Sequence, residues 1–222
     1  ISPDDLGLKT AHATPVVSHL ALLDRTSEVD WTSQRLGMID SLLWLAPQSS
    51  ALASGDHGLL DLAHLVGSMG GAELYHFREG SELVEPVMAA TRAAFQAQTL
   101  GEHQPLQWSG HRVEYRADVV PTGEIATRAG VQWVESDGRH LFFDGEYTVV
   151  EVNELGAWVL EHCVEPRSFE QLLETAIDRF GSPPDQAAET ALTTLVSALT
   201  EKHLLEVGEE AGPTVDLSDD QR

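Results

Sequence analysis

The chain has 222 residues, of which 42% are hydrophobic and 22% are charged. This apolar fraction is too high for a disordered chain, so we expect a packed core in one large or two small globular domains. The 36 acidic residues outnumber the 13 basic ones and give a formal net charge of −23. Because the basic residues are scattered singly, the sequence lacks the positive stripe that phosphate binding requires, and nucleic acid is not an expected partner.

Neither a targeting segment nor a disulfide is predicted. No stretch approaches the roughly 18 apolar residues that a membrane-spanning helix needs, and the acidic start of the sequence is unlike a secretory signal. We therefore expect a cytoplasmic protein with no membrane partner. Cys163 is the single cysteine, which excludes an internal disulfide and a thiolate zinc site.

The first half of the chain, to about residue 106, carries apolar residues at helical spacing. Asp56 is placed to cap one of the helices that this spacing indicates. We predict four helices in this half, at residues 16–23, 36–44, 59–69 and 81–98, and a short strand at residues 74–77.

A linker is predicted at residues 101–110, where Gly, Pro, Gln and Ser replace aliphatic residues. We place the domain boundary there, so that residues 1–106 form a mainly helical domain and residues 111–207 form a second domain. Residues 208–222 are acidic and contain little that could be buried, and we expect them to be a disordered tail.

The second domain is predicted to begin with strands and to end with helices. Val113, Tyr115 and Ala117 alternate with charged residues, which is the pattern of a half-buried strand. The other predicted elements are a hairpin at residues 131–143 that turns at Asp137-Gly138, a strand at residues 147–152, and helices at residues 154–163, 169–180 and 183–203, the first two capped by Asn153 and Ser168.

The landmark residues of this half stand in a recognisable order. The sequence LFFD at 141–144 precedes YTVVEVNE at 147–154, and PRSFEQL at 166–172 precedes LVSALTEKHLL at 195–205. This order resembles the PqqD-like family, also called RiPP recognition elements, over about residues 130–207. That family consists of small winged-helix domains that hold the leader of a ribosomally made precursor peptide while enzymes modify its core.

The resemblance implies an α+β fold with a C-terminal winged helix-turn-helix made of a three-stranded sheet and three helices. It also implies that the leader adds as an extra strand to the third strand, with its apolar side chains between that strand and the last helix. The implied strand edge is formed by Tyr147, Thr148, Val149, Val150, Glu151 and Val152. The implied groove wall is formed by Leu192, Leu195, Val196 and Leu199.

An alternative for these four helix residues is that they fill the domain core, as apolar helix positions usually do. The strand edge is therefore the stronger part of the prediction. The resemblance implies a non-catalytic accessory protein without a cofactor, whose partners are the leader peptide and the modifying enzymes of the same natural-product pathway.

The role of the N-terminal domain stays open among docking of an enzyme, formation of a homodimer, and the remnant of a larger catalytic fold. His57, Asp61 and His64 lie at helical spacing and could offer two imidazoles and a carboxylate to a metal. A solvated polar face explains the triplet as well, and no nucleophile motif such as GxSxG occurs. We expect no metal and no catalytic residue, and a peptide-modifying enzyme with its active site in this domain is the alternative.

A winged helix is also compatible with a transcription regulator. The helix predicted at residues 169–180 carries Glu170, Glu174 and Asp178 against a single Arg179. Such a helix would meet DNA phosphates with net repulsion, so DNA binding is the less favoured function.

Overall fold

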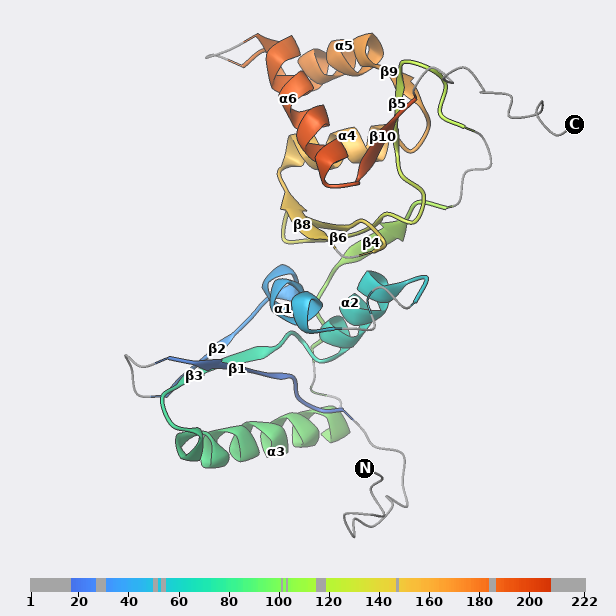
Figure 1. Cartoon of the computed structure of the whole chain (residues 1–222). Helices are drawn as coiled ribbons and strands as arrows, with labels where there is room; N and C mark the ends of the chain where they lie inside the picture. The colour runs from blue at the N-terminus through green and yellow to red at the C-terminus, as the bar shows by residue number, and fades with distance from the viewer. Residues whose placement is uncertain are drawn as a thin grey trace, which may run out of the picture. The chain divides into compact units, whose positions relative to one another are not determined.

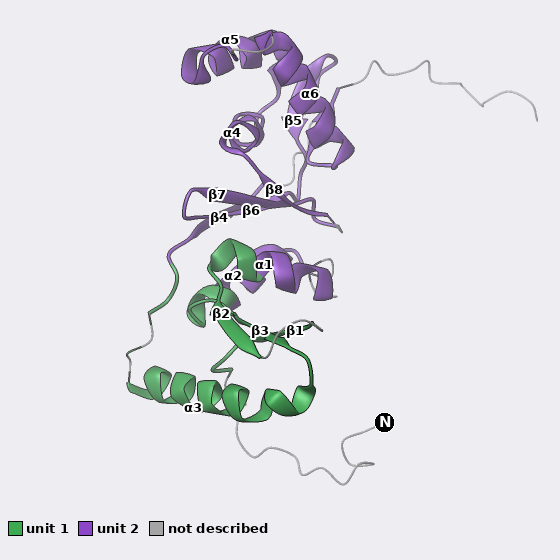
Figure 2. Ribbon diagram, turned by 90° about the vertical axis from the view of Figure 1, so that its left-hand side faces the viewer, with its two compact units in different colours: residues 1–41, 66–106 green, residues 42–65, 107–222 purple. Residues whose placement is uncertain are grey.

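The computed structural model describes residues 17–26, 31–49, 52, 55–100, 102, 104–114, 119–146, 148–183 and 187–208. These residues form a mixed α+β structure with six α-helices and three sheets (Figure 1), which confirms the predicted class. The chain divides into two compact units (Figure 2). Unit 1 consists of residues 1–41 and 66–106, and unit 2 consists of residues 42–65 and 107–222.

Unit 1 is built on a three-stranded mixed sheet. Its central strand β3 (Glu73–Phe77) pairs in parallel with β1 (Ala21–Arg25) and antiparallel with β2 (Thr32–Arg35). Helix α3 (Val84–Leu100) runs along this sheet (Figure 1). The predicted strand at residues 74–77 is confirmed, but the prediction of a mainly helical N-terminal domain missed the sheet.

The predicted helix at residues 16–23 is wrong, because this part of the chain enters β1. Leu22 is 5% exposed and its neighbour Leu23 is 59% exposed, which is the alternation of a strand. All five residues of β1 pair with β3, and this long-range pairing decides the conformation where a short apolar pattern is ambiguous. Val16 lies outside the described residues.

The other helices predicted in the first half are confirmed. Helix α1 (Met38–Leu45) continues into a 3₁₀-helix at Ala46–Gln48, and a second 3₁₀-helix at Gly80–Glu82 precedes α3. Helix α2 (Gly58–Ser68) stops before two glycines with positive φ, Gly70 at 65° and Gly71 at 96°. Glycine adopts such angles without steric cost, which explains where α2 ends.

The larger sheet of unit 2 is antiparallel and has the strand order β4-β6-β7-β8. The predicted hairpin is confirmed, and Asp137 and Gly138 in its turn have φ values of 54° and 71°, as a type I′ turn requires. Side chains on both faces of this sheet are buried, since neighbouring residues of β7 point to opposite faces and Leu141 and Phe142 are each 0% exposed. The strands are β4 (Ser109–Arg112), β6 (Gln132–Ser136), β7 (Arg139–Phe143) and β8 (Val149–Val152).

A second sheet of unit 2, with the order β10-β5-β9, was not predicted. It consists of β5 (Glu124–Thr127), β9 (Arg167–Ser168) and β10 (Leu205–Val207). Strands of two to four residues are too short to leave a periodic pattern in the sequence. Tyr115 and Ala117 of the strand predicted at the start of the second domain lie outside the described residues.

Helix α4 (Glu154–His162) packs on the larger sheet, and α5 (Phe169–Phe180) packs on α4 and on α6 (Ala188–Glu201). Both predicted caps are confirmed, because Asn153 Oδ1 accepts from the N–H of Gly156 at 2.8 Å and Ser168 Oγ accepts from the N–H of Gln171 at 3.3 Å. The helices and the sheet share one core, which includes Trp133, Phe142, Trp158, Leu160, Leu172, Leu192 and Leu199.

Residues 42–65 group with unit 2 although they precede the predicted linker, and a buried glutamine on β6 contacts them. Gln132 is 1% exposed. Its Oε1 accepts from the backbone N–H of Leu59 at 3.1 Å and of Leu60 at 3.3 Å, and its Nε2 donates to the carbonyl of Asp56 at 3.2 Å. Gln132 therefore provides the acceptor for the first turn of α2 that the sequence analysis assigned to the side chain of Asp56.

We expect Gln132→Leu to lower the free energy of unfolding by about 1–3 kcal/mol, because one buried and one partly buried N–H group lose their acceptor. Gln34→Leu, at an exposed position of β2, is the matched control and should change stability by less than about 0.5 kcal/mol. Denaturant unfolding followed by circular dichroism measures both changes. Equal effects of the two substitutions would contradict the capping role of Gln132.

Candidate functional site

β8 is an outer strand of the larger sheet, and among the described residues it pairs only with β7. The N–H of Asp144 donates to the carbonyl of Thr148 at 3.1 Å, just before β8 begins. Hydrogen-bonded and non-bonded pairs alternate along antiparallel strands, so Val150 also bonds toward β7. The N–H and C=O groups of Val149 and Glu151 consequently point away from the sheet.

The side chain of Glu151 is tied back to the sheet. Nε and Nη2 of Arg139 on β7 donate to its two carboxylate oxygens at 2.7 and 2.9 Å. These hydrogen bonds lower the pKa of Glu151, which therefore stays ionised at neutral pH. The pairing holds the carboxylate toward β7 and leaves the outward backbone groups of β8 uncovered by it.

An apolar surface adjoins the C-terminal end of β8. A Cβ atom on Gly156 would lie 3.2 Å from Cβ of Val152 and 3.7 Å from Cδ1 of Leu195, so glycine allows β8, α4 and α6 to meet closely at this point. Val152, Leu155 and Leu195 are partly buried and pack against the core of unit 2. Their remaining exposed parts form an apolar surface next to the strand edge.

This apolar surface continues into a pocket of about 120 Å³ between α4, α5 and α6. Leu155 belongs to both, which makes the two continuous. Ile177 and Phe180 in the pocket are 37% and 38% exposed, so the pocket opens to solvent. The other lining residues include Leu173, Ala188, Ala191 and Leu192.

The structure separates the predicted groove residues into two groups. Leu192, Val196 and Leu199 are 2%, 9% and 4% exposed and belong to the core, whereas Leu195 is partly exposed beside β8. Of the predicted strand edge, Val149, Val150, Glu151 and Val152 form β8, Thr148 precedes it, and Tyr147 lies outside the described residues. The part that these residues play in binding stays a prediction.

The sequence analysis did not identify Leu155 and Phe180. Both are apolar residues of helices α4 and α5, whose position beside α6 depends on long-range packing. The helical spacing within each segment could identify an apolar face, but it could not indicate that the two faces line one pocket.

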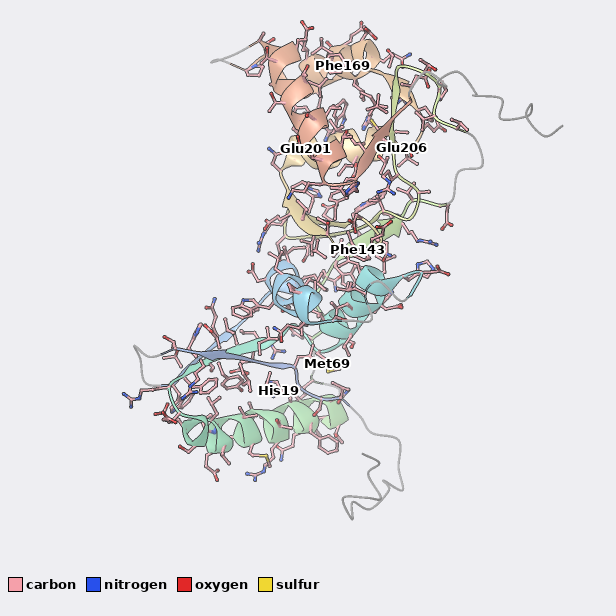
Figure 3. The ribbon with its side chains drawn as sticks, in the orientation of Figure 1. His19, Met69, Phe143, Phe169, Glu201 and Glu206 are labelled. Carbon is pink, nitrogen blue, oxygen red and sulfur yellow. The ribbon has the colours of Figure 1, made fainter. Side chains whose placement is uncertain are left out.

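A second groove, of about 610 Å³, lies between α6 and the β5–β10 pair. Ile125, Phe169 and Val207 provide apolar lining, and Glu189 and Glu201 line it from α6. Figure 3 labels Phe169 at the start of α5 and Glu201 at the end of α6. β8 contributes no residue to this groove, so it is separate from the candidate strand edge.

The proposed ligand triplet of the N-terminal half is not brought together. Among the residues that the structure describes, no three His, Cys, Asp or Glu side chains lie close enough to hold a metal ion. His57, Asp61 and His64 are all exposed, and the ring of His64 packs edge-on against Trp108 with centroids 4.8 Å apart.

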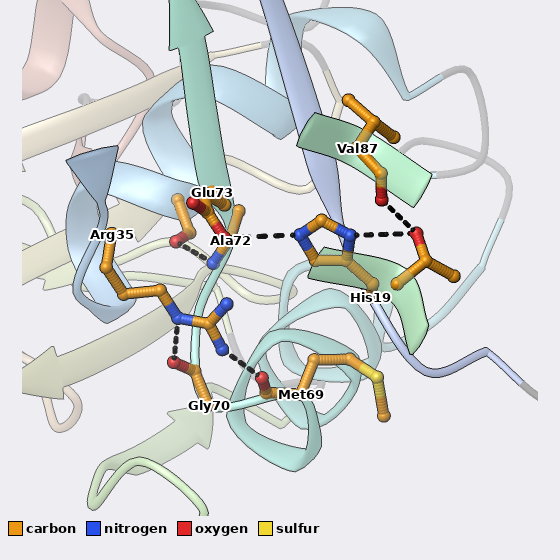
Figure 4. Close-up of polar contacts among 9 residues, drawn as sticks. His19, Arg35, Met69, Gly70, Ala72, Glu73 and Val87 are labelled. Atoms are coloured by element: carbon orange, nitrogen blue, oxygen red, sulfur yellow. Dashed lines mark hydrogen bonds and ion pairs between the residues drawn. The ribbon is translucent and has the colours of Figure 1, made fainter. Parts of the chain in front are cut away.

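Unit 1 contains a buried polar cluster that the sequence analysis missed (Figure 4). His19 Nδ1 lies 3.3 Å from Thr91 Oγ1 on α3, and His19 Nε2 lies 3.5 Å from Glu73 Oε2 on β3. Burial lowers the pKa of His19, although Glu73 acts in the opposite direction. Burial and the nearby Glu73 raise the pKa of Tyr75 to about 12. His19 and Tyr75 are therefore both neutral at pH 7.

Residues 140–205 match the family model described as coenzyme PQQ synthesis protein D (PqqD). This is the RiPP recognition element family, so the C-terminal half carries a segment of the family that the sequence resembled. The family consists of non-catalytic domains that bind precursor peptides and act with modifying enzymes. No curated protein and no solved structure matches the chain. In the described residues, no helix is both long and apolar enough to cross a membrane.

The burial of His19 predicts a dependence of stability on pH. Its pKa in the folded protein lies below the unfolded value of 6.5, so protonation opposes folding and stability falls as the pH drops below about 6.5. We expect the Tm of the wild type to fall more between about pH 7.5 and 5.5 than the Tm of His19→Gln does, as calorimetry would measure. His57→Gln, at an exposed position, is the control and should follow the wild type. Identical losses in all three proteins would contradict the prediction.

Proposed function

We propose that the C-terminal half binds the leader of a ribosomally synthesised precursor peptide as an extra strand on β8 and presents it to the modifying enzymes of the pathway. The observation that carries this proposal is the outer edge of β8, which has no strand partner among the described residues and lies inside the PqqD segment. In this proposal the protein is a non-catalytic accessory protein of the cytoplasm, and the helices and sheet of its C-terminal half act as a winged helix-turn-helix.

Strand addition would use the backbone of β8. Val149 and Glu151 direct two N–H donors and two carbonyl acceptors outward, as the register with β7 implies. These groups would hold an extended peptide whatever its sequence is, and they would fix its register along the edge. The carboxylate of Glu151 would not compete for this position, because Arg139 holds it.

Selectivity among peptides would come from the apolar surface beside the edge. Alternate side chains of an added strand point to the same face, so those on the Val152 side would approach Leu155 and Leu195. Beyond Leu155, the pocket that contains Phe180 offers space for one further apolar group. The arrangement therefore favours a leader with apolar residues at alternate positions, followed by a larger apolar residue.

The charge of α5 argues against a transcription regulator. Arg179, the one basic residue of this helix, lies 3.8 Å from Glu154 and its guanidinium stands 5.3 Å from the ring centroid of Phe180. It is thus already engaged within the protein, whereas Glu170 and Glu174 are exposed. A helix of this kind would repel the phosphates of a DNA groove.

We expect Val149→Pro to weaken leader binding by about tenfold or more, which corresponds to about 1.4 kcal/mol, because proline removes an outward N–H group. The stability should change little, since proline is tolerated at the first residue of a strand. Fluorescence anisotropy measures the affinity, with a labelled leader taken from any precursor peptide that the neighbouring genes are found to encode. Val149→Ala, which keeps the N–H group, is the control for loss of the side chain.

Val150→Pro removes an N–H group that points into the sheet, where Val149→Pro removes one that points outward. The N–H group of Val150 points toward β7, so this substitution should lower the Tm as well as the affinity. Binding of the leader that is unaffected by Val149→Pro would contradict strand addition at β8. Tight binding to duplex DNA that weakens steeply between about 50 and 200 mM salt, without any affinity for the leader, would support the regulator instead.

Leu195→Asp tests the apolar surface. We expect it to weaken leader binding by about tenfold or more, because a carboxylate would replace an apolar contact next to β8. Thr194→Asp, at an exposed position one residue earlier, adds the same charge and should leave the affinity within about twofold. Circular dichroism of both variants checks that α6 is still folded. Equal affinities of the two variants would remove Leu195 from the proposed site.

A further inference from the structure

The groove of about 610 Å³ between α6 and the β5–β10 pair is a second surface of unit 2 that could hold a ligand. Ile125 and Val207 are cross-strand neighbours of β5 and β10, so their side chains lie on the same face of the small sheet. Ile125 and Val196 are buried at 4% and 9% exposure, whereas Val207 is 43% exposed. The apolar lining therefore reaches from the core of unit 2 to its surface.

Two threonines of α6 also line the groove, and their hydroxyl groups are bonded within the helix. Thr193 Oγ1 donates to the carbonyl of Glu189 at 2.8 Å, and Thr200 Oγ1 donates to the carbonyl of Val196 at 2.8 Å. A hydroxyl group has a single hydrogen to donate, and both threonines have used it. The middle of the groove therefore offers a ligand mostly apolar contact.

The charge of the groove comes from Glu189 in the first turn of α6 and Glu201 in its last turn. Both side chains are exposed, and neither has an ion-pair partner within the part of the chain that the structure describes. They are twelve residues apart, which corresponds to about 18 Å along the helix. None of the described residues that line the groove is a lysine or an arginine. An occupant therefore meets an apolar middle with a negative charge at each end.

The groove and the proposed leader surface lie on opposite sides of α6. Ser197 lines the groove, whereas Leu195 lies beside β8. Successive residues of an α-helix are rotated by about 100°, so these two positions differ by about 200° around the helix. In addition, Ile125 and Val207 lie outside the PqqD segment at residues 140–205. The groove is therefore separate from the strand edge, and one of its walls is not part of the family segment.

We propose that this groove docks a segment of a second protein that carries apolar side chains between two basic residues. A lysine or arginine at each end of the segment would pair with Glu189 and Glu201, and the apolar side chains between them would cover Val207. This inference does not rest on leader binding at β8, because the two surfaces share no residue. A leader and a docked segment could be bound at the same time.

The charge of the groove argues against three other occupants. Residues 209–222 follow β10 after Gly208, but they contain five acidic residues and one basic residue. A second copy of the chain would bring a net charge of −23 to the same two carboxylates. The phosphates of a nucleic acid would be repelled in the same way. A basic segment of a different protein is the occupant that the charges favour.

A synthetic peptide with blocked ends, Lys-Ser-Leu-Ser-Leu-Ser-Lys, is the probe for this groove. When it is extended, its two lysines lie about 20 Å apart and on the same face as its leucines. Amide NMR spectra of the isotope-labelled full-length protein should show saturable shifts at the groove residues, with a Kd below about 1 mM. Replacing both lysines by glutamate, or both leucines by serine, should weaken binding by about tenfold or more.

Variants of the protein separate docking in the groove from a general attraction of cations. The double variant Glu189→Gln with Glu201→Gln should raise the Kd of the probe about fivefold, because two exposed ion pairs are lost. Glu174→Gln with Asp178→Asn removes the same charge from the exposed side of α5 and should leave the Kd within about twofold. Ser197→Trp should abolish binding by filling the groove. Ser197 is exposed, and circular dichroism checks that this variant is folded.

The proposal is overturned if about 5 mM probe produces no shift at the groove residues. It is also overturned if the peptide without leucines binds as tightly as the probe, since that result indicates attraction to the acidic surface alone. Equal Kd values for the wild type and the Glu189→Gln, Glu201→Gln variant would have the same meaning. Leader binding by Ser197→Trp is measured in parallel and should be unchanged, so failure at the groove and failure at β8 are distinguishable.

Discussion

The β6–β7 hairpin is covered on both faces, and this constraint decides where a peptide can reach the larger sheet. Phe142 lies in the helical core with its ring stacked 5.7 Å from that of Trp133, while Leu141 is buried on the opposite face. A ligand cannot lie across a sheet that has no open face, so only the backbone of an outer strand is available to it. Of the two outer strands, β8 adjoins an apolar surface, whereas β4 has the sequence Ser-Gly-His-Arg.

The covering of both faces of the β6–β7 hairpin also explains why residues 42–65 belong to unit 2. A polar side chain on a covered face must find hydrogen-bond partners there, and Gln132 finds them in the first turn of α2. The PqqD segment begins only at residue 140, so both Gln132 and the residues that it contacts lie before it. The chain thus combines a family segment with a sheet that extends beyond it and with a helical segment of its own.

Local signals in the sequence were sufficient for much of the C-terminal half. Asp137-Gly138, Asn153 and Ser168 each act on the backbone within a few residues, and each was found where it was predicted. The conformation of segments that pair with distant strands was not predicted correctly. β1 was taken for a helix because its pairing with β3 is not visible in its own residues.

In the candidate site, too, local patterns were predicted correctly and long-range contacts were not. Periodicity identified the apolar face of α6, but it could not distinguish the core residue Leu192 from the partly exposed Leu195, since the difference depends on how α4 and β8 approach the helix. Periodicity in α3 likewise predicted a helix without indicating that Met88 and Phe95 would be exposed while Ala90 and Ala94 would be partly buried.

Because the two units are interleaved along the chain, their residues leave the ribosome in an order that differs from the order of the units. Unit 1 has all of its residues once position 106 has been synthesised, whereas residues 42–65 must wait for the strands that follow. Leu59 and Leu60 emerge more than 70 residues before the glutamine that accepts their N–H groups. Until Gln132 has been synthesised, water or a chaperone must accept hydrogen bonds from these two N–H groups. The first turn of α2 therefore reaches its final hydrogen bonding later than the last turn.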